Sequence, residues 1–103
     1  MPEQRVRAQV PAHHPCFAGH FPGNPVVPAV VLLDHVLIAV QAWRGPHWQL
    51  RRLRAAKFLR PLLPDETFEI LLRLSGTSPQ ARLDWRCERD SQLLAEGIWD
   101  AGP

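Results

Sequence analysis

Cysteine is scarce in this sequence, with only Cys16 and Cys87 among 103 residues. Two cysteines so far apart do not make a disulfide framework, so the sequence predicts a protein of the reducing cytoplasm. It also contains no Cys-x-x-Cys or His-x-x-x-His pair, although His13 and His14 are adjacent. Because a zinc site needs more ligands at suitable spacing, we expect no metal and no cofactor. A nucleophilic Cys16 would need a base and an orienting third group, so a small buried apolar role is favoured.

A strong charge excess, a signal peptide and a membrane-spanning run are also missing. The net charge of +2 is too weak to indicate a nucleic-acid partner. Residues 1–9 are polar and charged, unlike a signal peptide, and Asp34 and His35 interrupt the longest apolar run before it could span a membrane. With no repeats or linkers, residues 1–103 are predicted to form one domain, small enough to gain from an oligomer interface.

That apolar run, Val30–Trp43, is predicted to be a helix because it is too long for an ordinary strand. Pro28 suits its first helical position, and Gly45-Pro46 supplies a stop. The apolar side chains that cover nearly its whole circumference are Val30, Val31, Leu33, Leu37, Ile38 and Val40. A helix that is apolar all round is expected to be buried on all sides.

Asp34 is the one acidic residue on this helix. An unpaired carboxylate is expensive to bury, so something must pair it, protonate it or reach it through a pocket. One interpretation is a carboxylate that caps a backbone group or faces an interface. The other is a catalytic acid in a dry pocket.

Five strands are predicted around the helix. They are Glu3–Val10, His47–Leu59, Glu66–Leu74, a strand spanning residues 81–88, and Leu93–Trp99. The first inward row is predicted to be Phe68, Ile70, Leu72 and Leu74, and the second Ala81, Leu83, Trp85 and Cys87. Turns of three to five residues, at Gly76–Pro79 and Asp90-Ser91, would make an antiparallel meander. The sheet must then curl around the helix, because nothing else in the chain can cover it, and the class is α+β.

The segment before the helix resembles the signature of a known enzyme family. It reads His20-Phe21-Pro22-Gly23-Asn24-Pro25-Val26-Val27-Pro28-Ala29, and the apolar run then reaches Asp34. The 3-hydroxyacyl-[acyl-carrier-protein] dehydratases, of the FabZ and FabA type, have His-Phe-x-Gly-x-Pro-x-x-Pro-Gly, an apolar run, and then Glu or Asp. A second stretch, Lys57–Pro61 with Pro64–Glu66, is similar to the family's second landmark. The resemblance covers about residues 5–100, looks closest to compact members, and implies the hotdog fold.

Three residues depart from the family pattern. Ala29 replaces a glycine but keeps the backbone N–H, and its methyl group could tighten the pocket. Ile38 stands where the family often has glutamine, which removes a polar neighbour of the acid. The acid itself is Asp34, as in members that also isomerise the product, and this alone does not establish isomerase activity.

The resemblance implies removal of water from a 3-hydroxyacyl thioester on acyl carrier protein, giving the trans-2-enoyl thioester in fatty-acid, polyene or polyketide-type synthesis. His20 would take the C2 proton, Asp34 would help the C3 hydroxyl leave, and the Ala29 N–H would hold the thioester oxygen. The residues implied to bind substrate are Phe21, Gly23, Val27, Pro28 and Val30. His20 and Asp34 would meet across a homodimer, one from each chain. Without the motif, His20 would be read as a loop histidine that binds backbone carbonyls.

The implied partner is an acidic acyl carrier protein that presents the substrate on a phosphopantetheine arm. Its candidate contacts are the basic residues of the predicted strand at 47–59, namely Arg51, Arg52, Arg54 and Lys57. The other interpretation of this basic run is a solvated strand face.

Two other functions stay open. A hotdog thioesterase or a CoA-dependent hydratase is the alternative enzyme, although the loop does not match the thioesterase pattern. A non-catalytic hotdog subunit that supports an active partner is the other class, because Ala29 and Ile38 depart from the family.

Overall fold

The computed structural model describes residues 2–18, 25–77 and 79–103, which form one long helix, a short 3-10 turn and five strands. In chain order these are β1 (Glu3–Gln9), η1 (Pro15–Phe17), α1 (Ala29–Arg44), β2 (Gln49–Phe58), β3 (Thr67–Thr77), β4 (Gln80–Arg89) and β5 (Gln92–Gly102). The predicted α+β class is confirmed. None of the helices in the described residues is long and apolar enough to cross a membrane.

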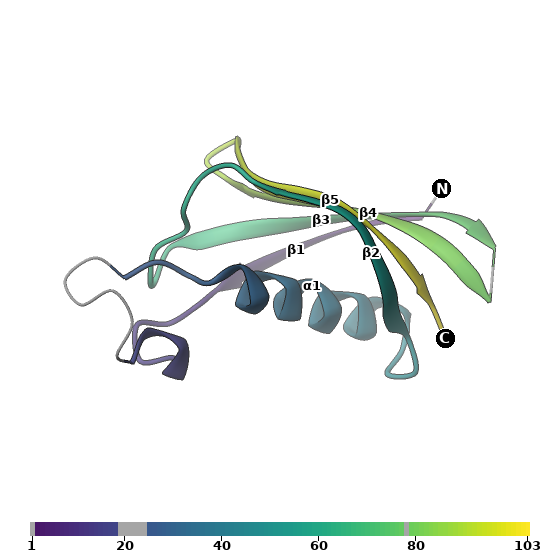
Figure 1. The fold of residues 1–103 in the computed structure, drawn as a ribbon, viewed down its shortest axis with the longest axis horizontal. Helices are drawn as coiled ribbons and strands as arrows, with labels where there is room; N and C mark the ends of the chain where they lie inside the picture. Colours follow the sequence, from purple (N-terminus) through teal and green to yellow (C-terminus); the bar gives the residue numbers. More distant parts are fainter. Residues whose placement is uncertain (1, 19–24, 78) are drawn as a thin grey trace.

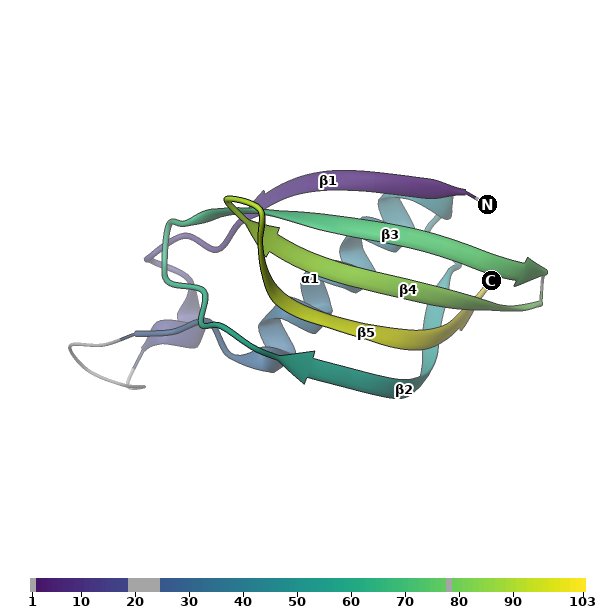
Figure 2. The same cartoon turned by 90° about the horizontal axis from the view of Figure 1, so that it is seen from above.

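The strands form one antiparallel sheet in the order β1-β3-β4-β5-β2. Figure 1 shows this sheet arching over α1, and Figure 2 shows β1 and β2 as its two edges. The predicted meander is present in β3, β4 and β5. β2 comes earlier in the chain and lies at the far edge, beside β5. The sheet therefore curls around one side of α1, as the sequence predicts.

The ends of α1 follow from a proline and a glycine. Pro28 stays outside the helix with φ −63° and ψ 149°, so the prediction that it takes the first helical position is wrong by one residue. Its carbonyl instead accepts the N–H of Val31 at 3.0 Å and of Leu32 at 3.3 Å. Gly45 ends the helix at φ 125°, a backbone conformation that side-chain-bearing residues rarely adopt.

The two inward rows predicted for β3 and β4 are confirmed. All eight side chains are buried, namely Phe68, Ile70, Leu72, Leu74, Ala81, Leu83, Trp85 and Cys87. Trp85 lies directly opposite Gly97 of β5. A Cβ on Gly97 would lie 2.6 Å from the Trp85 ring, so the missing side chain makes room for the indole.

The hairpins are tighter than the predicted three to five residues. The sequence predicts a turn from Gly76 onward, but Gly76 and Thr77 continue β3 and pair with Ala81 and Gln80. Only Asp90 and Ser91 join β4 to β5, and their φ angles are 51° and 64°. Two successive positive φ angles give a turn whose twist matches that of the flanking strands.

The alternation of β2 is irregular because its pairing with β5 shifts twice. The shifts fall between Leu50 and Arg52 and between Leu53 and Ala55. Each irregularity changes the direction in which the following side chains point. The strand also runs over 49–58, shorter at both ends than the predicted 47–59.

The two faces of α1 have different surroundings. Leu32, Val36, Ala39 and Val40 are buried against the sheet. Val30 and Ile38 are 68% and 59% exposed, and Asp34 between them is exposed as well. The prediction that α1 is buried on all sides is therefore wrong for the single chain, because one sheet layer covers only one side of a helix. We call the residues Val30, Asp34 and Ile38 the outer stripe.

Candidate active site

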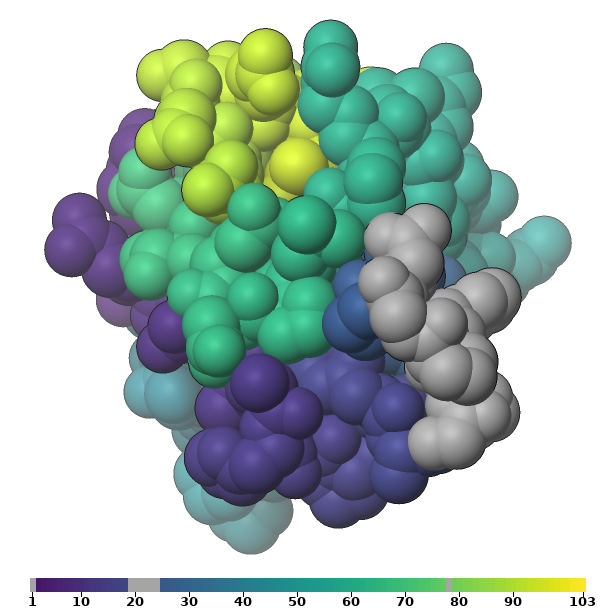
Figure 3. Space-filling view, turned by 90° about the vertical axis from the view of Figure 1, so that its left-hand side faces the viewer, coloured from purple at the N-terminus to yellow at the C-terminus, as the bar shows by residue number. Residues whose placement is uncertain are grey.

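A shallow groove of about 230 Å³ lies at the beginning of α1. One wall consists of Val26, Val27, Ala29 and Leu32, and the segment 58–62 forms the other. The Val27 N–H donates to the carbonyl of Leu62 at 2.8 Å, which holds the two walls together. Figure 3 views the molecule from this end, where the segment that enters α1 meets the segment that follows β2. The groove thus joins a helix N-terminus to apolar side chains.

The N–H of Ala29 lies at the open end of the helix. The next free N–H groups, of Val31 and Leu32, are taken by the Pro28 carbonyl. Within the described part of the chain, the Ala29 N–H has no hydrogen-bond acceptor. The positive end of the helix dipole adds to its attraction for a negatively charged oxygen. The groove can therefore hold a polarised carbonyl at this position.

Asp34 lies outside this groove within one chain. Its side chain is exposed on the outer stripe, one turn after Val30 and one turn before Ile38. It is not among the residues that line the groove. A single chain therefore leaves Asp34 in solvent, and the dry pocket expected for a catalytic acid would need a second protein surface.

The other predicted site residues divide into three groups. Val27 is 7% exposed and lines the groove, and half-buried Pro28 lies between it and Ala29. Val30 faces away from the groove on the outer stripe. His20, Phe21 and Gly23 lie outside the described residues. Their predicted roles stay predictions.

Several residues of the groove are missing from the predicted site. They are Val26, Leu32, Phe58, Leu59, Arg60, Pro61 and Leu62. Most belong to the stretch 57–61, which resembles the family's second landmark. That landmark could have placed them at the site, because it was the only signal linking this distant segment to the helix.

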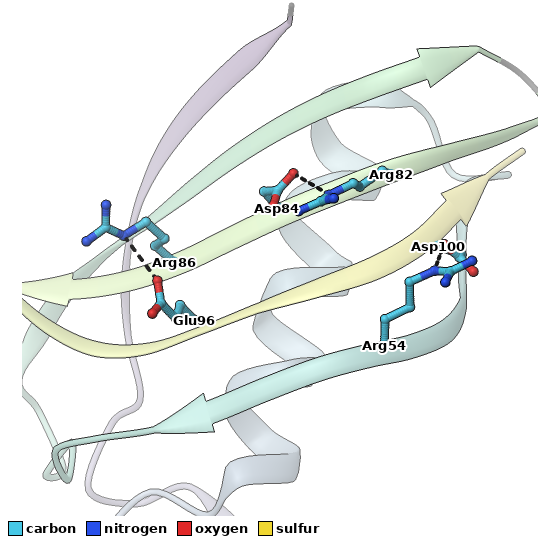
Figure 4. A network of polar contacts seen from close by, with 6 residues as sticks. All are labelled: Arg54, Arg82, Asp84, Arg86, Glu96 and Asp100. Carbon is cyan, nitrogen blue, oxygen red and sulfur yellow. Dashed lines mark hydrogen bonds and ion pairs between the residues drawn. The ribbon is translucent and has the colours of Figure 1, made fainter.

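The predicted carrier-protein contacts differ in their pairing. Arg54 of β2 donates to Asp100 of β5 at 2.7 Å, and Asp100 is 6% exposed. Figure 4 shows this pair beside the Arg82–Asp84 and Arg86–Glu96 pairs on the sheet. The hydrogen bond to Asp100 raises the pKa of the Arg54 guanidinium above its usual value.

The remaining basic residues are freer. Arg51 donates to the Pro103 carbonyl. Arg52 and Lys57 are exposed, and neither has an ion-pair partner in the portions of the chain that the structure describes. Arg60, which the sequence-based list omits, lies at the groove itself. Lys57 and Arg60 are therefore the basic residues nearest the groove wall in sequence.

A histidine of α1 lies beside the outer stripe. His35 is half-buried and meets the Phe68 ring edge-on, with the ring centroids 6.2 Å apart. Burial lowers its pKa, the charge of His14 lowers it further, and Asp34 opposes both effects. His14 is not simply solvated, because its Nδ1 accepts the N–H of Cys16 at 3.0 Å and caps η1.

Neither cysteine carries the features of a nucleophile. Cys16 is half-buried against the core, and burial raises the pKa of its thiol. Cys87 is fully buried, and burial raises its pKa to about 12. Both thiols are therefore held in the less reactive protonated form at neutral pH.

Residues 2–98 match one protein-family model, described as ApeI-like: ApeI dehydratase. The chain is also similar to the 3-hydroxyacyl-[acyl-carrier-protein] dehydratase FabZ of Latilactobacillus sakei, with 33% identity over 76 residues, covering 67% of this chain and 54% of that protein. For FabZ of Mannheimia succiniciproducens the identity is 30% over 73 residues, covering 63% and 49%. The chain spans about half the length of these curated relatives.

Solved structures with a similar fold include enzymes of several activities. The dehydratase heterocomplex ApeI:P from Xenorhabdus doucetiae gives a TM-score of 0.78 at 22% identity, covering 98% of this chain and 88% of that chain. The (R)-hydratase from A. caviae gives 0.74 at 13%, covering 98% and 93%. A probable thioesterase from Bartonella henselae gives 0.77 at 14%, covering 98% and 90%. These likenesses confirm the predicted hotdog fold.

Proposed function

Since the chain belongs to the ApeI-like dehydratase family, we propose that it removes water from a 3-hydroxyacyl thioester carried on acyl carrier protein. The product is the trans-2-enoyl thioester. The observation that carries the proposal is the apolar groove at the start of α1, where the Ala29 N–H has no acceptor among the described residues. A thioester carbonyl that enters this groove meets a donor at a helix N-terminus, where negative charge is stabilised.

The proposed reaction needs three groups. His20 takes a proton from C2 as the general base, since imidazole titrates near neutral pH. Asp34 donates a proton to the C3 hydroxyl, which leaves as water while the C2–C3 double bond forms. The Ala29 N–H holds the thioester oxygen while negative charge builds on it. Proton transfer by each of the two side chains contributes about 10²- to 10⁴-fold to the rate.

A second subunit of the same fold completes this site. Asp34 and the groove belong to different surfaces of one chain, and exposed Val30 and Ile38 flank the acid. Covering the outer stripe with a second subunit would bury these apolar side chains and remove Asp34 from water. The sequence predicts a homodimer, in which His20 of one chain meets Asp34 of the other.

The substrate arrives on an acidic acyl carrier protein whose phosphopantetheine arm reaches the groove. Lys57 and Arg60 are the preferred contacts, because Arg60 lines the groove and Lys57 precedes the groove residue Phe58. Exposed cations near a site mouth mainly raise the association rate, and salt weakens their effect. A rate that is insensitive to ionic strength would contradict this contact.

The deciding experiment mixes the purified protein with 3-hydroxyacyl carrier-protein thioesters of increasing chain length. It is run over a series of protein concentrations, because the site needs two subunits. Enoyl absorbance supports the dehydratase, and release of free thiol would instead show a thioesterase. Neither signal would leave the non-catalytic supporting subunit. A His20→Ala variant that keeps the full dehydration rate would refute the proposed mechanism.

A further inference from the structure

Exposed large apolar side chains gather on one side of the described structure. Those on α1 are Val30 and Ile38, and those on β2 and the segment after it are Leu53, Phe58, Leu59 and Leu63. α1 and β2 are in contact with each other. β2 is also an edge strand, which pairs with β5 on one side and leaves the backbone groups of its other side free. This side of the molecule therefore has the features of a protein interface.

The same strand carries positive charge only. The sequence has no Asp or Glu between His35 and Pro64, and β2 contains Arg51, Arg52, Arg54 and Lys57. Of these, Arg54 has an ion pair, with Asp100, while Arg52 and Lys57 have none in the described parts of the chain. The other edge, β1, mixes both signs, because Glu3 lies near Arg5 and Arg5 pairs with Glu69 at 3.1 Å.

Pairing β2 with its own copy would be unfavourable electrostatically. Antiparallel pairing would bring together six arginines, Arg51, Arg52 and Arg54 from each copy. Neighbouring strands lie about 4.8 Å apart, well inside the Debye length of about 10 Å at 0.1 M salt. Like charges opposite each other across a strand pair destabilise it.

We propose that the free edge of β2 pairs with the edge strand of an unlike subunit of the same fold, which presents Asp or Glu opposite Arg51, Arg52 and Arg54. The proposal rests on the two-subunit site described above and names the partner that completes it. Opposite charges at the seam attract this partner, and the exposed apolar side chains supply buried area. It replaces the homodimer with a pair of unlike chains and leaves Lys57 and Arg60 to the carrier protein.

A competing explanation is that the arginines keep β2 unpaired. Charged residues on edge strands protect many proteins against aggregation. That explanation leaves Val30, Ile38 and Leu53 uncovered, and it predicts that no strand pairs with β2 whatever its charge. The two explanations therefore differ in a measurable way.

The test uses a copy of this chain with an acidic edge, Arg51→Glu/Arg52→Glu, as the partner probe. Light scattering after gel filtration gives the mass of the natural protein, of the variant, and of an equal mixture. We expect the mixture to assemble to twice the 11.7 kDa of one chain. At low salt its Kd should be about tenfold below that of either protein alone, and about 0.5 M salt should remove most of the difference.

Two further variants make the test decisive. Arg5→Glu/Arg7→Glu makes the same charge change on the other edge strand and should not assemble with the natural protein. Arg51→Gln/Arg52→Gln should associate with itself more readily than the natural protein does, and it guards against a fold defect specific to the glutamates. The proposal is overturned if the natural protein alone forms an equally tight dimer, if the mixture stays monomeric, or if the β1 variant assembles equally well.

The mass measurement needs no substrate, so it is independent of the proposed dehydration. Repeating the dehydration assay on the mixed assembly separates the two proposals. An assembled but inactive pair would count against the dehydratase alone. An active dimer of the natural chain would count against the unlike partner alone.

Discussion

The inner face and the outer stripe of α1 are equally apolar in sequence, but they are covered differently. The inner face, with Val36 fully buried, packs against the sheet of its own chain. The outer stripe, with Ile38 59% exposed, carries Asp34 and has no cover in the single chain. An apolar helix circumference thus indicates burial but does not say which chain provides it. In this protein the inner face stabilises the fold, and the outer stripe is available for assembly and catalysis.

The largest expected effect comes from changing the acid of the outer stripe. Asp34→Asn should lower the dehydration rate of the assembled protein by about 10²- to 10⁴-fold, because the proton donor at the C3 hydroxyl is lost. The free energy of unfolding should change by less than about 0.5 kcal/mol, since the side chain is exposed in the single chain. Steady-state kinetics and urea unfolding measure the two quantities.

A matched control is Asp90→Asn. It makes the same chemical change at an exposed turn residue with a positive φ, which asparagine tolerates. Both its rate and its stability should stay close to the natural values. An Asp34→Asn protein with an undiminished rate would remove the outer stripe from catalysis.

The same substitution on the two faces tests the comparison directly. Val36→Ala should lower the free energy of unfolding by about 2–3 kcal/mol, because it removes buried methyl groups and leaves a cavity. Val30→Ala, at a position that is 68% exposed, should change it by less than about 0.5 kcal/mol in the monomer. Urea unfolding at a protein concentration that keeps the chain monomeric checks both. Equal losses would mean that the outer stripe is covered within one chain.

A smaller effect is expected at His35, beside the outer stripe. Burial lowers the pKa of His35 in the folded state, so the unfolded chain takes up a proton first as the pH falls through 6.5. Stability is therefore complete above 6.5 and is lost as the pH falls toward the lowered folded-state pKa. His14 strengthens the shift and Asp34 opposes it. Urea unfolding at about pH 7.5 and 5.5 should show a larger loss in the natural protein than in His35→Gln. Identical losses would contradict the shift.

The sequence predicted the sheet best where side chains alternate cleanly. The inward rows that contain Phe68 and Trp85 were placed correctly, because a period of two is visible without any knowledge of the neighbouring strands. β2 was predicted less well, since two shifts in its pairing with β5 interrupt the alternation. The turn at Asp90-Ser91 was found, but its length of two residues depends on φ angles that those residue types rarely adopt.

The groove was predicted in part. Val27 and Ala29 were chosen because of the motif, and both line it. Leu32 and Phe58 were missed, because the contact between α1 and the end of β2 joins segments far apart in the chain. The exposure of Asp34 could not be predicted, because hydrophobic periodicity is the same whether the cover is the chain's own sheet or another subunit.

The smallest expected effect on the fold comes from Ile38, at the far end of the outer stripe. Ile38→Ser should change the free energy of unfolding of the monomer by less than about 0.5 kcal/mol, because the side chain is 59% exposed there. In the assembly with the Arg51→Glu/Arg52→Glu probe, the same substitution should raise the Kd, since the lost apolar area would otherwise be buried between subunits. Ala42→Ser, at another exposed position of α1, is the control for an added hydroxyl on the helix. A monomer destabilised by several kcal/mol would show that Ile38 packs within its own chain, and the difference between the two faces of α1 would disappear.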